Sequence, residues 1–271
     1  DNLTLSNDDT LTIDPGVNVL FMGEYEFLVH GAFYANGAES DSIRFTSGQF
    51  SKQKGDWNSL QFENADSSSF LNYSVVEFAG GPTNGSYYIG NVSTTNSRLL
   101  INNCNIHSSS NLGIFASNTK IIINNSLIHN NDFDGIYLHE NSTADMSSNE
   151  IYNNLQDGVE IRNSYVNTTN NDIHNNMNYG IYILNAEVDI IGNVVHNNNT
   201  GFYIRNGTYG NMIGNNIYNN QARGINISES TLDIIGNDIH NNGDWSIYTN
   251  NSTTNIIGNN IIELNILFLS S

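Results

Sequence analysis

A single register of 22 or 23 residues repeats along the chain from residue 101 to residue 262. Each repeat carries the phrase Asn, any residue, Ile, His or Tyr, Asn, Asn, and a glycine followed by alternating apolar residues comes shortly after it. The first position of the phrase is occupied by Cys104, Ser126, Asn149, Asn171, Asn193, Asn215, Asn237 and Asn259. A fixed period of this length indicates a solenoid, in which each repeat is one structural unit stacked on the next.

The length of the repeat favours strands over helices. About 22 residues are too few for two helices and their turns, and the framework is isoleucine and asparagine instead of leucine. Apolar and polar residues alternate within the repeat, which is typical of strands with one buried face. Three short strands and three bends account for one repeat. We therefore predict an all-β, single-stranded parallel β-helix of about 12 coils with about 22 residues each.

Stacked coils place equivalent side chains in columns, at the ~4.8 Å spacing of neighbouring strands. The apolar column from Ile106 to Ile261 is expected to face inward. Asparagine makes up 51 of the 271 residues, and it favours tight bends and left-handed backbone. Its amide can both donate and accept along a column. We expect a structural ladder at one bend, formed by Asn149, Asn171, Asn193, Asn215, Asn237 and Asn259.

The repeat is less regular near the N-terminus. We interpret residues 1–271 as a single β-helix domain, with irregular coils in residues 1–100, regular coils in residues 101–262 and an apolar edge in residues 263–271. The expected assembly edge consists of Ile261, Ile262, Leu264, Ile266 and Phe268. An open strand edge must be covered, either by a further coil of a longer protein or by another subunit. We favour self-association into a homopolymer or lattice.

The repeated phrase resembles the parallel β-helix repeat superfamily, of the pectate-lyase-like kind. The segments Leu11-Thr-Ile-Asp-Pro-Gly-Val17 and Gly55-Asp-Trp57 are similar to the first coils of archaeal and bacterial secreted surface proteins with right-handed β-helix repeats. The resemblance covers essentially the whole chain and implies a right-handed helix. It does not select a function, because the superfamily includes lyases, hydrolases, binding proteins and inert scaffolds.

The charge of the chain excludes two classes of partner. The formal net charge is −19, from 27 acidic and 8 basic residues, whereas nucleic acids and anionic lipids are bound by basic surfaces. No apolar run reaches the ~18 residues of a membrane span. The acidity, the start at Asp1 and 12 Asn-x-Ser/Thr sequons favour a secreted or cell-surface protein. The candidate glycosylation sites include Asn72, Asn141, Asn167, Asn206, Asn226 and Asn251.

One cluster is a catalytic candidate. Glu160 and Arg162, with His139 and Arg205, occupy outward positions beside the repeated glycine on neighbouring coils. A polysaccharide lyase or glycoside hydrolase needs acids and a base gathered on one such face. The alternative, an outer ion pair between Glu160 and Arg162, is the interpretation that we prefer, because the carboxylate pattern of polygalacturonases is absent.

The same face carries tyrosines on several coils. Tyr137, Tyr182, Tyr203 and Tyr248 could form a strip on which sugar rings stack, which makes a polysaccharide a candidate partner. Tyrosine also suits an exposed strand for reasons of packing alone.

Two patterns suggest metal ions. His107, His129, His174, His196 and His240 share one column, and adjacent members are near enough to share a soft metal ion. The resemblance to periplasmic copper-maturation proteins makes copper the first candidate. The segment from Asn131 to Gly135 offers oxygen atoms that Ca²⁺ prefers, but it lacks the remaining ligands of a calcium loop, so we prefer to interpret it as a polar bend. We expect no other cofactor.

The favoured function is therefore an extracellular structural protein of a surface layer, sheath, filament or adhesin, and not an enzyme. The alternative is a carbohydrate-binding or polysaccharide-cleaving β-helix. The third hypothesis is a periplasmic copper-binding β-helix.

Overall fold

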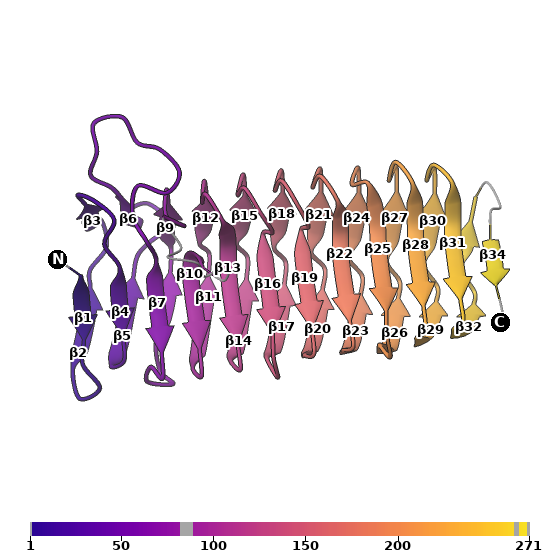
Figure 1. Ribbon diagram of the computed structural model, residues 1–271, viewed down its shortest axis with the longest axis horizontal. Coiled ribbons are helices and arrows are strands. Elements are labelled where there is room, and N and C mark those ends of the chain that lie inside the picture. The colour runs from indigo at the N-terminus through magenta and orange to yellow at the C-terminus, as the bar shows by residue number, and fades with distance from the viewer. Residues whose placement is uncertain (1, 82–88, 263–265, 270–271) are drawn as a thin grey trace.

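The computed structural model describes residues 2–81, 89–262 and 266–269, and these residues form a stack of coils along one axis. Figure 1 shows the N- and C-termini at opposite ends of the stack, with one strand of each sheet added per coil. Every strand pair between coils is parallel, and the described residues contain no helix. This confirms the predicted all-β solenoid of about 12 coils.

Three sheets run along the stack. The first sheet contains β1 (Leu3–Leu5), β4 (Phe27–Val29), β7 (Leu60–Glu63), β10 (Gly90–Thr95), β13 (Leu112–Ser117), β16 (Ile136–His139), β19 (Val159–Arg162), β22 (Tyr179–Leu184), β25 (Thr200–Arg205), β28 (Arg223–Ser228), β31 (Trp245–Asn250) and β34 (Ile266–Leu269). The second sheet contains β2 (Thr10–Ile13), β5 (Ala32–Asn36), β8 (Phe70–Asn72), β11 (Arg98–Asn102), β14 (Lys120–Asn124), β17 (Thr143–Ser147), β20 (Tyr165–Thr169), β23 (Glu187–Ile191), β26 (Tyr209–Ile213), β29 (Thr231–Ile235) and β32 (Thr253–Ile257). The third sheet contains β3 (Asn18–Phe21), β6 (Ile43–Ser47), β9 (Ser74–Glu77), β12 (Asn105–His107), β15 (Leu127–His129), β18 (Glu150–Tyr152), β21 (Asp172–His174), β24 (Val194–His196), β27 (Asn216–Tyr218), β30 (Asp238–His240) and β33 (Asn260–Ile261).

The register between coils follows the repeat. Ile151 pairs with Ile173, and Ile173 pairs with Val195 on the next coil. All three side chains are fully buried, because alternate residues of each strand face the interior. The core is thus a set of aliphatic columns enclosed by the three sheets.

Two asparagine ladders line corners of the coil. In the ladder between the second and third sheets, the Asn171 amide donates to Asn193 Oδ1 at 3.0 Å, and the Asn193 amide donates to Asn215 Oδ1 at 3.2 Å. A second buried ladder, which we did not predict, lies between the third and first sheets and consists of Asn131, Asn154, Asn176, Asn198, Asn220 and Asn242. The two ladders satisfy polar groups at corners that would otherwise be buried without partners.

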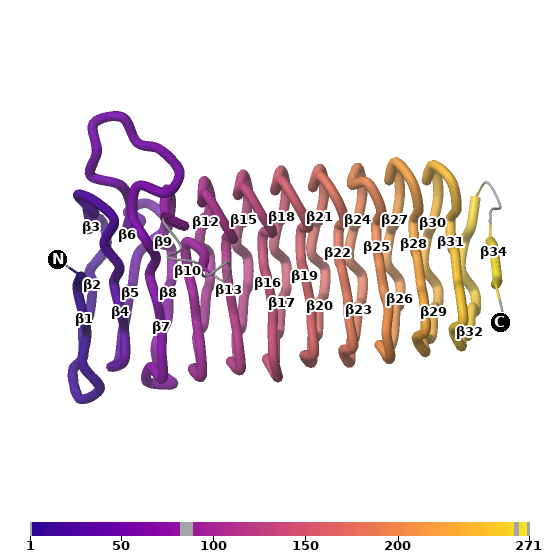
Figure 2. Tube along the Cα trace, viewed as in Figure 1, coloured from indigo at the N-terminus to yellow at the C-terminus, as the bar shows by residue number. Residues whose placement is uncertain are grey.

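The N-terminal coils are filled by aromatic side chains. The ring of Trp57 stacks on Phe21 with 3.9 Å between the ring centroids, and its Nε1 donates to the carbonyl oxygen of Glu77 at 2.8 Å. Trp57 belongs to the segment that joins β6 to β7, and Figure 2 shows that this segment protrudes beyond the regular coils. The interior of the wider N-terminal coils is therefore packed with aromatic rings where the regular coils have aliphatic columns, although the strands stay in register.

At the other end, β34 pairs with β31 in the first sheet. Ile261 and Ile266 pack partly against the core, whereas Ile262 and Phe268 are exposed. Leu264 lies outside the described residues, and self-association through this edge stays a prediction. No helix that the structure describes is both long and apolar enough to span a membrane.

Candidate active site

Two aspartates occupy the same corner of successive coils, immediately before the first sheet. Asp134 precedes Gly135 at the start of β16, and Asp157 precedes Gly158 at the start of β19. The backbone amide of Asp157 donates to Asp134 Oδ1 at 2.9 Å, and the backbone amide of Tyr179 donates to Asp157 Oδ1 at 3.1 Å. The carboxyl groups are therefore fixed by the stacking of the coils.

Glu160 completes a cluster with these two residues. Side-chain oxygen atoms of Asp134, Asp157 and Glu160 all lie within 4.8 Å of one another. The three residues are 3, 6 and 8% exposed, respectively. Acidic side chains are rarely this buried without full charge compensation, so the cluster must hold protons or a cation.

Burial changes the acidity of both aspartates. It raises the pKa of the Asp134 carboxyl to about 9, and the like charges of Asp157 and Glu160 add to the effect. Burial is also the main reason that the pKa of Asp157 rises to about 7. Asp134 therefore carries a proton at neutral pH, and it donates this proton in a hydrogen bond to Glu160.

Arg162 supplies the positive charge beside the cluster. Its Nε donates to Glu160 Oε1, and its guanidinium lies over the ring of Tyr137 at 5.8 Å and over the ring of Tyr182 at 5.6 Å. Burial raises the pKa of the Tyr182 hydroxyl, so this group is a neutral proton donor near the arginine. The arrangement joins a buried acid, an arginine and phenols on one face.

The other candidates of this face are spread over a wider area. His139 stands at the end of β16, with its ring centroid 5.4 Å from that of Tyr137, and Arg205 lies over the ring of Tyr203. Neither residue belongs to the cluster of Asp134, Asp157 and Glu160.

The tyrosine strip is not continuous on the surface. Tyr137 is buried against Phe115, which corrects the expectation that it faces outward to solvent. Tyr182 and Tyr203 are neighbours with 5.6 Å between their ring centroids. Tyr248 lies under Arg223, two strands beyond Tyr203.

Our sequence interpretation missed part of the cluster. We took Asp134 as a residue of a polar bend or calcium loop and did not single out Asp157. The signal was an Asp-Gly pair in the same place on two successive repeats, at 134–135 and 157–158. Tyr179 occupies this place on the next coil, and burial raises the pKa of its hydroxyl.

The histidines form a separate stack on the third sheet. The rings of His107 and His129 are 4.8 Å apart, and those of His174 and His196 are also 4.8 Å apart. Tyr152 and Tyr218 occupy the intervening coils, and His240 continues the column beyond Tyr218.

Carboxylates on the preceding coil accompany His174 and His196. His174 Nε2 contacts Glu150 at 3.2 Å and His196 Nε2 contacts Asp172 at 3.1 Å. Ligand atoms of Asp172, His174 and His196 lie within 4.8 Å of one another, so metal binding here stays a prediction.

The candidate glycosylation sites divide by position. Asn141, Asn206 and Asn251 are exposed at bends with left-handed backbone. Asn72, Asn167 and Asn226 are half-buried within strands β8, β20 and β28. Occupancy of these sequons stays a prediction.

Solved structures with the same fold include enzymes. A mutant of the periplasmic alginate epimerase AlgG aligns with a TM-score of 0.62 at 14% identity, over 98% of this chain and 76% of that chain. The pectate lyase Pel9A aligns with a TM-score of 0.52 at 13% identity, over 94% of this chain and 70% of that chain. Tailspike protein 2 from an Escherichia coli O157:H7 bacteriophage aligns with a TM-score of 0.62 at 13% identity, over 90% of this chain and 42% of that chain. These identities show a shared fold.

The favoured sequence interpretation, an extracellular structural protein, is wrong. The similar structures are an epimerase, a lyase and a tailspike with an enzymatically active domain, and they favour the carbohydrate-active alternative. The buried carboxyl cluster is consistent with this correction, because perturbed acids gather at functional sites more often than on inert surfaces.

The sequence itself has a family match. No curated protein sequence matches the chain significantly. The family described as "Right handed beta helix region" matches residues 62–187 and 180–267, and the chain therefore belongs to this family of right-handed β-helix proteins.

Proposed function

We propose that the protein is a secreted enzyme that acts on a polysaccharide at the first sheet. The observation that carries the proposal is the cluster of Asp134, Asp157 and Glu160, whose carboxyl oxygen atoms lie within 4.8 Å of one another. The fold shared with an alginate epimerase and a pectate lyase supports a carbohydrate substrate. The epimerase is periplasmic, which supports secretion of this protein as well.

Arg162 favours an acidic sugar as the substrate. Its guanidinium has five N–H donors, so it can hold a sugar carboxylate while it remains bonded to Glu160. The protonated state of Asp134 reduces the negative charge that would repel such a substrate. A uronate polysaccharide is therefore the substrate class that we assign.

The acidities support proton transfer near neutral pH. General acid–base catalysis is most effective when the pKa of the catalytic group is close to the working pH, and that of Asp157 is about 7. Neutralisation of the sugar carboxylate by Arg162 acidifies the neighbouring C–H group. Asp157 in its ionised form would then accept this proton. In β-elimination, the carbanion would expel the glycosidic oxygen at the next carbon as a double bond forms, and the leaving oxygen would take a proton from a neutral donor such as the Tyr182 hydroxyl. In epimerisation, the glycosidic bond would stay intact and the carbanion would take a proton from such a donor on its opposite face.

Hydrolysis with inversion fits the cluster poorly. That reaction needs two carboxyl groups separated by roughly 6.5–9.5 Å, so that a water molecule fits between them. The oxygen atoms of this cluster lie within 4.8 Å of one another.

The same carboxyl groups fit a calcium ion. Three acidic side chains supply hard oxygen donors that lie within 4.8 Å of one another, and burial raises the pKa of the two aspartates among them. Asp134, Asp157 and Glu160 would hold the ion, which would supply further neutralisation of a substrate carboxylate.

Activity on a panel of uronate and neutral polysaccharides tests the proposal. Ultraviolet absorbance detects unsaturated uronates, NMR detects epimerised residues, and a reducing-end assay detects hydrolysis. We expect elimination or epimerisation by the wild-type protein, with and without Ca²⁺, and loss of it in Asp157→Asn. Asp8→Asn, which changes an exposed acid in the first coils, is the matched control. A wild-type protein that is inactive on every uronate polysaccharide would overturn the assignment.

A further inference from the structure

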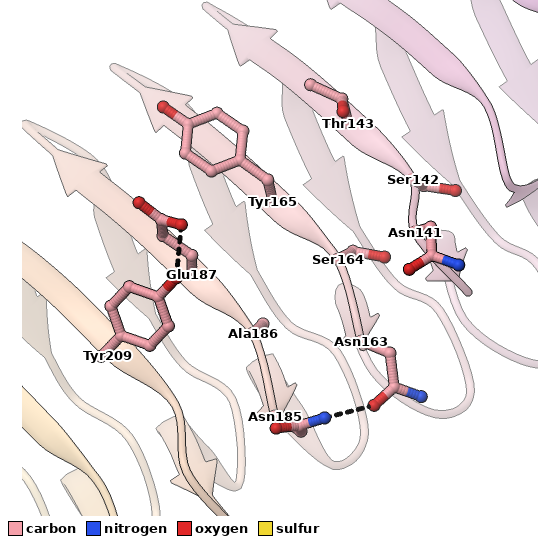
Figure 3. A pocket seen from close by; sticks show the side chains of 10 residues that line it. All are labelled: Asn141, Ser142, Thr143, Asn163, Ser164, Tyr165, Asn185, Ala186, Glu187 and Tyr209. Carbon is pink, nitrogen blue, oxygen red and sulfur yellow. Dashed lines mark hydrogen bonds between the residues drawn. The ribbon is translucent and has the colours of Figure 1, made fainter.

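A groove lies at the end of the first-sheet strands, where the chain passes into the second sheet. The carboxyl cluster lies at the opposite end of these strands, where they begin. The groove spans successive coils and has a volume of about 420 Å³. Figure 3 shows that its lining is contributed by the bends before β17, β20 and β23 and by the first residues of these strands and of β26. We name it the Tyr165–Tyr209 groove, after its two tyrosines. None of its lining residues belongs to the cluster of Asp134, Asp157 and Glu160.

The two tyrosines are placed by the register of the coils. Tyr165 pairs with Glu187, and Glu187 pairs with Tyr209 on the next coil. The tyrosines are therefore two strand spacings apart, about 9.6 Å along the axis. That separation is close to the length of two sugar rings in an extended chain.

Both rings are accessible to a ligand. Tyr165 is 39% exposed and Tyr209 is 50% exposed. The Tyr209 hydroxyl donates to Glu187 Oε2 at 2.5 Å, which fixes the orientation of the ring (Figure 3). Ordered aromatic rings with a polar tip are suited to stacking against the C–H face of a sugar.

Amide groups occupy the rest of the groove. Asn141, Asn163 and Asn185 follow one another on successive coils and are exposed. The Asn185 amide donates to Asn163 Oδ1 at 2.8 Å, so the amides form a short row (Figure 3). An amide both donates and accepts, as does a sugar hydroxyl, and the row runs parallel to the line that joins the tyrosines.

The charge of the groove selects among sugars. Glu187 is the one charged residue among those that line the described groove. Glu187 would repel an anionic sugar, and none of the residues that line the described groove is basic. The carboxyl cluster differs in this respect, since Arg162 accompanies it.

We propose that the Tyr165–Tyr209 groove binds an uncharged polysaccharide, with a sugar stacked on each tyrosine and its hydroxyl groups bonded to the asparagine row. The site is additional to the proposed active site and does not depend on its chemistry. Binding of a neutral glycan would hold the enzyme on a matrix that also contains its acidic substrate.

The experiment uses protein produced without N-glycosylation, because Asn141 belongs to a sequon and a glycan there would fill the groove. Calorimetry with neutral oligosaccharides of increasing length, such as gluco-, xylo- and manno-oligomers, measures affinity. We expect binding to increase up to the length that spans both tyrosines. Each of Tyr165→Ala and Tyr209→Ala should weaken it by about 2- to 12-fold, the range expected for one aromatic contact.

Three controls make the result specific. Tyr25→Ala removes a similarly exposed tyrosine from the N-terminal coils and should leave affinity unchanged. Tyr165→Phe keeps the ring and should retain binding. Activity on a uronate polysaccharide should be the same in wild-type protein and in Tyr165→Ala, so a failure of this proposal is separable from a failure of the proposed function.

Two outcomes would overturn the inference. One is that the double variant Tyr165→Ala, Tyr209→Ala binds every neutral oligosaccharide as tightly as wild-type protein does. The other is that wild-type protein binds uronate oligomers and no neutral ones in this assay.

Discussion

The Asp134 carboxyl group accepts a hydrogen bond from the backbone amide of Asp157, one coil further along the stack, at 2.9 Å between Oδ1 and N. This contact shows how the solenoid builds a site. Stacking brings two like acids together at a spacing that electrostatics alone would oppose. The backbone amides of Asp157 and Tyr179 each bind Oδ1 of one aspartate, and both carboxyl groups stay within 4.8 Å of the Glu160 carboxyl group.

The carboxyl cluster should make stability depend on pH. The pKa of Asp134 is about 9 in the folded protein and 3.8 as its ordinary value, so the folded state binds more protons between these values. Stability should therefore fall as pH rises from about 4 to about 9, and Asp157 adds to the fall up to about pH 7. Melting temperatures measured across this range test the slope.

Asp134→Asn supplies the comparison for this slope. The amide mimics the protonated acid, so the variant should melt higher than wild-type protein at pH 9 and should show a smaller slope. Asp8→Asn should behave as wild-type protein does, because Asp8 is exposed. An unchanged slope in Asp134→Asn would contradict the assigned protonation state.

The fold could be predicted from the sequence because a solenoid repeats one short structural unit. One period determines which residues pair, and the column from Ile106 to Ile261 identifies the inward face. The second asparagine ladder was contained in the same phrase. We missed it because the two asparagines that end the phrase have different roles, as Asn153 adopts left-handed backbone with φ 54° and Asn154 is buried in the ladder.

The carboxyl cluster was harder to predict. Glu160 occupies an outward strand position, and sequence alternation indicates that such a position faces solvent. The residue is buried because Arg162 and the flanking tyrosines cover it, and that is a property of three neighbouring coils together. Periodicity gives the direction of a side chain, whereas its burial depends on the size of its neighbours.

Arg162 should determine the affinity for an acidic substrate. Arg162→Lys keeps the charge but loses the planar set of donors that bonds Glu160 and a sugar carboxylate together. We expect KM for a uronate polysaccharide to rise by about 10-fold or more, as for the loss of a hydrogen bond to a charged group. Steady-state kinetics measure the change. Arg98→Lys, in the second sheet, should leave KM unchanged, and equal KM values for both variants would exclude a role in substrate binding.

The predicted ladder should be a major source of stability in the regular coils. Asn193 Oδ1 accepts from the backbone and side-chain amides of Asn171, and its own amide donates to Thr168 and Asn215. Asn193→Ala leaves buried donors without partners, which should lower the free energy of unfolding by about 1–3 kcal/mol for each group left unsatisfied. Urea denaturation measures the loss.

Asn175 is the matched control for the ladder. It has left-handed backbone with φ 55° and lies outside both ladders, so Asn175→Gly should keep the bend and change stability much less than Asn193→Ala does. Equal destabilisation by the two variants would mean that the bend, and not the amide ladder, stabilises this corner.

The histidine stack should make folding stability change with pH in the opposite direction to the carboxyl cluster, so that stability falls as the pH is lowered. Burial lowers the pKa of His129 to about 4, and the charge of His107 adds to the effect. The unfolded state therefore binds more protons between about pH 4 and pH 6.5, and the stability that neutral His129 provides is lost as pH falls through this range.

His129→Tyr should remove this acid sensitivity and keep the stack. Tyr152 already occupies the next position of the column, with its ring 4.7 Å from that of His129 and nearly parallel to it. We expect the variant to fold with the same circular dichroism and to lose less stability than wild-type protein between pH 6.5 and pH 4. NMR titration of the wild-type protein should show the His129 ring still neutral at pH 5, and a midpoint near that of an exposed histidine would contradict the burial that we assign to it.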